Sequence, residues 1–69
     1  MTPKEQALKL YDKFFNNAES RNKIGLYDED LHKYNTKQCA LIAVDEMIEV
    51  CESYVAPYYY EVKKEIEKL

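Results

Sequence analysis

Apolar residues near the start of the chain recur with the spacing of an amphipathic helix. On a helical wheel, the apolar positions between residues 7 and 18 cover an arc of about 160°. Thr2, Pro3 and Glu5 precede them and supply an N-cap, a proline at the first helical position and the acid of a capping box. We therefore predict a helix over residues 3–18, which ends before the only glycine of the chain, Gly25.

A second, longer stretch predicts the main helix over residues 36–55, with Asn35 or Thr36 as its N-cap. Its apolar residues spread over about 200° of the wheel, whereas a helix that docks on one neighbour needs a stripe of about 100°. Two arrangements would cover so wide a face: two flanking helices of the same chain, or a second subunit. We favour the subunit interface, because two short helices in so small a chain leave part of the face open.

The C-terminal residues predict a third helix over residues 58–68, which Pro57 opens. Residues 20–36 are ambiguous, although the acidic run 28–30 could cap a short helical turn. No alternating stretch is long enough to suggest a sheet. The predicted fold is therefore an all-α three-helix domain that spans residues 1–69 and is completed by homo-oligomerisation.

Composition narrows the class of protein further. The 69 residues suffice for one small domain, and 16 of them are Leu, Ile, Val or Phe, above the level of disordered chains. The net charge of −3 provides no positive field for nucleic-acid polymers or anionic lipids. No apolar segment approaches the length of a membrane span or a signal-peptide core, so we expect a cytoplasmic protein without membrane association.

Catalytic and metal-binding chemistry finds little support in the sequence. Cys39 and Cys51 lie on one predicted helix, about 18 Å apart along its axis, too far for a disulfide. The single histidine, His32, has no partner at metal-ligand spacing, and we expect it on the surface. Three carboxylates form what we interpret as a solvated ridge of the main helix: Asp45, Glu49 and Glu52. We therefore expect a protein that is not an enzyme and holds no metal or cofactor.

Cations, rings and short polar side chains gather before the main helix and suggest a ligand site. Thr36 and Lys37 would hold phosphate at the N-terminus of that helix, and Arg21 would add a forked contact to the same group. The ring of Tyr34 or Tyr60 would stack on a base. The plainer interpretation is a polar connector with a capped helix, and both interpretations stay open at this point.

Three blocks of the chain resemble one group of known sequences. They are Met1–Glu5, Lys37–Ile48 and Tyr58–Leu69. In this order they resemble a group of small uncharacterised proteins from phages of Bacteroidetes hosts, including crAss-like phages. Residues 16–35 are variable in length and content in that group and imply nothing for this chain.

The resemblance implies a phage-encoded protein that acts in the host cytoplasm. Small helical phage proteins outside the virion often disarm host immunity, and one such class binds cyclic nucleotide or cyclic ADP-ribose signals. We therefore expect a homo-oligomer that sequesters a nucleotide-derived immune signal, with five ligand-binding residues: Arg21, Tyr34, Thr36, Lys37 and Tyr60. The alternative is a protein–protein interaction module, an inhibitor or adaptor of a host or phage protein. A minor structural component would use the same surfaces.

Overall fold

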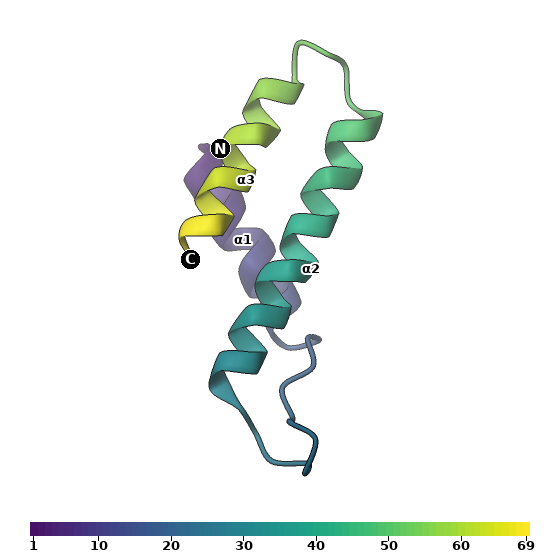
Figure 1. Cartoon of the computed structure of the whole chain (residues 1–69). Coiled ribbons are helices and arrows are strands. Elements are labelled where there is room, and N and C mark those ends of the chain that lie inside the picture. Colours follow the sequence, from purple (N-terminus) through teal and green to yellow (C-terminus); the bar gives the residue numbers. More distant parts are fainter.

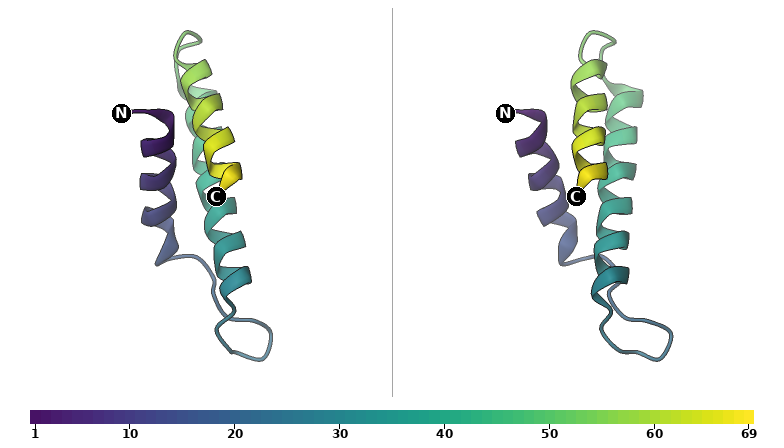
Figure 2. Two further views of the ribbon diagram at one scale, coloured as in Figure 1. Left: turned by 90° about the vertical axis from the view of Figure 1, so that its left-hand side faces the viewer. Right: turned by 60° about the vertical axis from the view of Figure 1, so that its left-hand side comes forward.

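The computed structural model describes residues 1–69 as three helices: α1 (Pro3–Phe15), α2 (Glu29–Val50) and α3 (Ala56–Lys68). Consecutive helices run in opposite directions, and every pair of helices is in contact (Figure 1). The molecule is elongated, with extents of 46 × 19 × 16 Å, and the loop between α1 and α2 projects beyond one end of the bundle (Figure 2). The all-α three-helix prediction is therefore confirmed.

The first helix begins where the capping box predicts. The backbone N–H of Glu5 donates to the Thr2 hydroxyl oxygen at 3.2 Å, and the Thr2 N–H donates to the Glu5 carboxylate at 3.0 Å. This hydrogen bond from the Thr2 backbone lowers the pKa of Glu5 below its usual value. The helix ends at Phe15, three residues before the predicted end, because Asn16 caps it and the chain then turns.

The main helix begins seven residues earlier than predicted. Asp28 is its N-cap, and the Asp28 carboxylate accepts the N–H of Leu31 at 3.0 Å. The predicted cap at Asn35 or Thr36 is wrong because neither side chain competes with the helix. The Asn35 amide donates outward to the carbonyl of Glu19 at 2.9 Å, and the Thr36 hydroxyl donates to the carbonyl of His32 at 2.7 Å.

The end of α2 also differs from the prediction. The helix stops at Val50 rather than residue 55, and Cys51 is extended with ψ of 162°. A turn then closes with the hydrogen bond from the Val55 N–H to the Glu52 carbonyl at 2.9 Å. Pro57 lies in the first turn of α3, where a missing N–H does no harm. The third helix is thus confirmed, beginning two residues before its predicted start.

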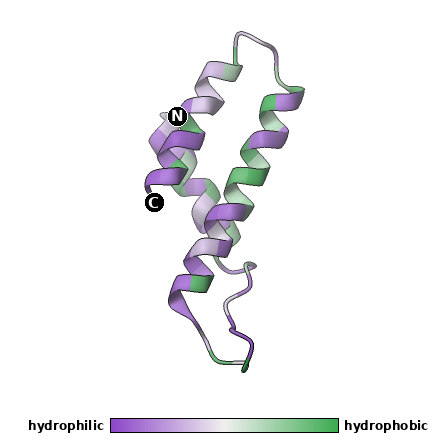
Figure 3. Cartoon of the chain, viewed as in Figure 1, coloured by the Kyte–Doolittle hydropathy of each residue, from purple (hydrophilic) through white to green (hydrophobic).

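The core lies where all three helices meet. Six apolar residues are almost fully buried: Ala7, Leu10, Ala40, Val44, Val62 and Ile66. Two of the six are alanines, one on α1 and one on α2, and their small side chains allow close helix approach. Figure 3 shows the apolar segments of α2 interrupted by polar ones along the whole helix.

The wide apolar face of α2 is covered largely from within the chain. Both α1 and α3 pack on α2, so the first of the two predicted arrangements, a central helix between two neighbours, accounts for most of this face. Three apolar side chains of the predicted main helix nevertheless stay exposed: Ile42 at 61%, Val50 at 83% and Tyr54 at 82%. Homo-oligomerisation stays a prediction.

Two valines of α2 provide a matched test of the core. Val44 is fully buried, whereas Val50 is 83% exposed. We expect Val44→Ala to lower the free energy of unfolding by about 2 kcal/mol, because it removes two buried methyl groups and leaves a cavity. Val50→Ala should change it by less than about 0.5 kcal/mol. Chemical denaturation followed by far-UV circular dichroism measures both, and equal losses would contradict the burial of Val44.

Candidate functional site

The loop between α1 and α2 forms a small hairpin, residues 21–27. Arg21 and Tyr27 face each other as an antiparallel bridge. The N–H of Asn22 donates to the carbonyl of Leu26, and the N–H of Gly25 donates to the carbonyl of Asn22, both at 2.9 Å. Gly25 has φ of 81°, a left-handed conformation that favours glycine. The only glycine of the chain thus serves the turn of this hairpin.

Side-chain hydrogen bonds stabilise the turn at the hairpin tip. The Asn22 amide oxygen accepts the N–H of Ile24 at 3.1 Å and the N–H of Leu26 at 3.2 Å. The Arg21 guanidinium donates to the carbonyl of Gly25 at 2.8 Å. The polar groups therefore point into the turn while two aliphatic side chains point into water. Ile24 is 78% exposed and Leu26 is 60% exposed.

Further hydrogen bonds join the hairpin to the bundle. The N–H of Asp28 donates to the carbonyl of Ser20 at 2.7 Å. The Glu19 carboxylate accepts the N–H groups of Ser20 and Arg21 at 3.0 and 2.9 Å, and Asn35 of α2 donates to the Glu19 carbonyl. The base of the hairpin is consequently closed by its own hydrogen bonds and tied to α2 through Asn35.

His32 is the central contact of this region. Its Nε2 lies against the carbonyl oxygen of Phe15, and its Nδ1 is 3.2 Å from the hydroxyl oxygen of Tyr27. Because a carbonyl oxygen only accepts, Nε2 carries the proton and Nδ1 accepts from the Tyr27 hydroxyl in the neutral ring. The imidazole also stacks on the Phe15 ring, with centroids 4.0 Å apart, and meets the Tyr27 ring edge-on at 5.7 Å.

The predicted surface position of His32 is wrong, because the side chain is only 7% exposed. The ring fills the corner between the end of α1, the start of α2 and the hairpin. It supplies hydrogen-bond partners to groups from the other two segments. A lone histidine in the sequence is therefore a buried structural connection in this fold.

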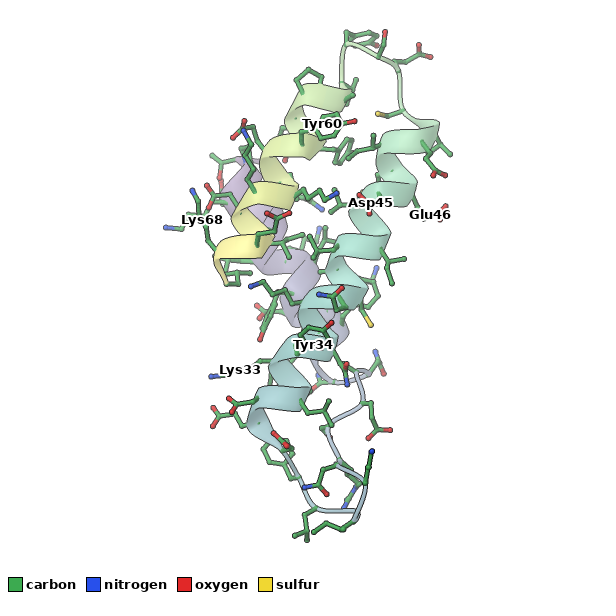
Figure 4. The ribbon with its side chains drawn as sticks, in the orientation of Figure 1. Lys33, Tyr34, Asp45, Glu46, Tyr60 and Lys68 are labelled. Atoms are coloured by element: carbon green, nitrogen blue, oxygen red, sulfur yellow. The ribbon has the colours of Figure 1, made fainter.

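The five predicted ligand-binding residues do not converge on one site. Thr36 is fully buried in the middle of α2, and its hydroxyl already donates within the helix. Arg21 is engaged inside the hairpin. Tyr60 is on α3, well separated from Tyr34 on α2 (Figure 4). Thr36 and Lys37 are consecutive, but Thr36 is buried, so only Tyr34 and Lys37, one turn apart on α2, can present side chains to one ligand.

The proposed phosphate contact at a helix N-terminus is wrong for Thr36 and Lys37. Both lie well inside α2, where no free N–H groups are available. The true N-terminus is occupied by the carboxylate of Asp28, and Glu29 and Asp30 stand in the first turn. These acids complement the positive end of the helix dipole themselves and would repel an anionic ligand.

The carboxylates of the predicted acidic ridge are exposed, but only Asp45 and Glu49 lie on α2, because the helix ends at Val50, before Glu52. Asp45 forms an ion pair with Lys63 of α3 at 3.1 Å. The hydrogen bond of the Lys63 ammonium group to the Asp45 carboxylate raises the pKa of Lys63 above its usual value. The side chain of Asp45 lies on the α3 side of the helix and that of Glu46 on the other side (Figure 4). Glu49 and Glu52 are also exposed.

Other kinds of site are not evident in the molecule. No group of three or more His, Cys, Asp or Glu residues is placed to hold a metal ion, and no pocket is present. Cys39 and Cys51 are both free thiols and half-buried. None of the helices combines the length and the apolar character that crossing a membrane requires.

Comparison of the chain with protein-family models, curated proteins and solved structures finds no match. The most distinctive feature of the chain is the hairpin, at residues for which the sequence predicted only an ambiguous connector. The available signal was Asn22 followed three residues later by Gly25, a spacing typical of a tight turn.

Replacing His32 should loosen the hairpin. We expect His32→Ala to lower the free energy of unfolding by about 2–3 kcal/mol, since it removes a stacked ring and leaves the Phe15 carbonyl without its donor. The exposed neighbour Lys33 makes only a surface ion pair with Glu29, so Lys33→Ala should change it by less than about 1 kcal/mol. Denaturation measures both changes. Amide hydrogen exchange should show faster exchange at Gly25 and Leu26 only in His32→Ala, and unchanged rates would contradict the anchoring role.

Proposed function

We propose that the chain is a non-enzymatic binding module that docks on a partner protein through the tip of the hairpin. The observation that carries this proposal is the pair of exposed aliphatic side chains, Ile24 and Leu26, on a turn that hydrogen bonds to Asn22 stabilise. Exposed apolar groups of this kind are typical of interaction surfaces. A fixed tip also loses little conformational entropy on binding.

The energetics favour the tip as an anchor. Burying an exposed Ile or Leu side chain contributes about 1.5–3 kcal/mol, so two such residues can dominate a small interface. Ile24 and Leu26 contribute little to the free energy of folding, because both side chains are exposed to water in the free chain. The aliphatic side chains of the tip would therefore contribute more free energy to binding than to folding.

The charges around the hairpin tip indicate what kind of surface would bind it. Arg21 and Lys23 are the only charged residues between positions 20 and 27, whereas the whole chain carries −3. A complementary surface would be an apolar pocket with an acidic or carbonyl-rich rim. Together with the resemblance to phage proteins, this supports a host protein as the partner and an inhibitor or adaptor as the role.

Photo-crosslinking in a Bacteroidetes host tests this proposal. Ile24→benzoylphenylalanine should cross-link one host protein far more than any other, because the photoreactive ring would lie in the pocket of the partner. Asp12→benzoylphenylalanine, at an exposed position of α1, is the control and should not capture it. Adding Leu26→Ser should reduce the adduct about tenfold, the effect of losing about 1.4 kcal/mol. The same adducts from positions 24 and 12 would contradict the proposal.

Sequestration of a nucleotide-derived signal is the second candidate function. One observation favours it: Tyr34 is 60% exposed, and Lys37 follows one turn later on α2. A ring and an ammonium group side by side can bind a base and a phosphate. Because the other predicted residues lie elsewhere, the remaining contacts would have to come from another subunit.

Calorimetry tests the second candidate. The panel consists of cyclic dinucleotides, cyclic trinucleotides and cyclic ADP-ribose isomers. If one of them binds, Lys37→Ala should weaken affinity by about 30-fold or more, since a charged contact is lost. Lys9→Ala, at an exposed position of α1 that is not among the predicted ligand-binding residues, serves as the matched control and should have no effect. Absence of heat with every ligand would contradict sequestration and leave protein docking as the function.

A further inference from the structure

The side of α2 opposite the core has a regular spacing of residues, of which Tyr34, Ile42 and Asp45 are exposed and Leu31 and Gln38 are half-buried. We call this side the outer face and define it by five residues: Leu31, Tyr34, Gln38, Ile42 and Asp45. Their spacings of three, four, four and three residues place them on one side of the helix. The buried residues Thr36, Ala40 and Val44 occupy the opposite side.

The outer face is symmetric about its centre. Tyr34 and Ile42 are exposed to the same extent, 60% and 61%, and each stands four residues from Gln38. If two copies of α2 met in antiparallel orientation at Gln38, each Tyr34 would lie on the Ile42 of the partner. An isologous contact requires this kind of self-complementarity.

The charge distribution selects the antiparallel orientation. The C-terminal half of α2 carries Asp45, Glu46 and Glu49 without a cation, whereas the charges of its N-terminal half, residues 29–38, cancel. A parallel pair would place the two acidic halves together. An antiparallel pair places each acidic half against the neutral half of the partner helix.

Gln38 suits the centre of such a contact. A glutamine amide is both donor and acceptor, so two copies can hydrogen-bond to each other across a two-fold axis. A polar residue at one position of a helical seam also fixes the register of the pair. Shifting the register by one turn would bury each amide against an apolar side chain and separate the tyrosines from the isoleucines.

We propose that two copies of this chain form an antiparallel dimer through the outer face of α2, with the two-fold axis at Gln38. This inference is independent of the proposed docking function, since it uses a different surface and leaves Ile24 and Leu26 outside the contact. It assigns an occupant to Ile42 and Tyr34, which the chain itself does not cover. It also adds apolar contacts to a fold whose core is small.

Cysteine cross-linking tests the position of the axis. The background carries Cys39→Ala and Cys51→Ala, with folding checked by circular dichroism. Gln38→Cys should form a disulfide-linked dimer on mild oxidation, because residues at the axis approach their symmetry mates. Tyr34→Cys and Ile42→Cys lie about 12 Å apart on the helix, so each should fail to cross-link with itself. The two variants should cross-link when they are mixed.

The pattern of cross-links distinguishes the alternatives. Lys64→Cys, at an exposed position of α3, sets the level of random collision. Cross-linking of Gln38→Cys no faster than that control would overturn the dimer. Efficient self-linking of both Tyr34→Cys and Ile42→Cys would show a parallel pair and would overturn the antiparallel arrangement.

Sedimentation provides a second measurement on the chain with its native cysteines. Ile42→Glu should raise the dimer dissociation constant about tenfold or more, since it places a charge at both symmetric contacts. Leu8→Glu on α1, where the leucine is 42% exposed and lies away from the outer face, is the matched control and should leave the constant unchanged. A chain that sediments as a monomer at every accessible concentration would contradict the dimer while leaving the docking proposal untouched.

Discussion

The continuity of α2 is the constraint on which the rest of the structure depends. The Asp28 cap starts the helix early, and it runs for 22 residues, whereas α1 and α3 have 13 each. Two short helices cannot cover a long one completely. The first turns of α2 therefore extend beyond the core and need support of another kind, which the hairpin and His32 supply. The polar connector is thus part of the fold rather than a passive link.

The continuity of α2 also determines which apolar side chains stay exposed on the surface. Because the core takes the side of α2 that carries Thr36, Ala40 and Val44, Tyr34 and Ile42 on the opposite side stay exposed. Because the hairpin turns its polar groups inward, its aliphatic side chains are left to water as well. Neither exposure contributes to the stability of the single chain. Both are available for contacts with other molecules.

Local signals in the sequence predicted more of the fold than of the site. The capping box at Thr2 and the proline at position 57 act within one turn, so the start of α1 and the presence of α3 followed from neighbouring residues. The start of α2 did not, because Asn35 and Thr36 resemble a cap until their partners are known. The partner of Asn35 is the Glu19 carbonyl, which tertiary packing brings near it. The partner of Thr36 is the His32 carbonyl, one turn earlier in the same helix.

The candidate site was misplaced for the same reason. A phosphate site at Thr36 required a helix N-terminus there, and the continuous helix removes it. His32 was expected in water because its partners, a backbone carbonyl and a tyrosine hydroxyl, leave no pattern in the sequence. In this chain, apolar side chains that stay exposed without contributing to the fold indicate function better than the polar motifs of the sequence do. Polar replacements at Ile24 or Ile42 leave the core intact, so they separate the loss of a contact from the loss of the fold.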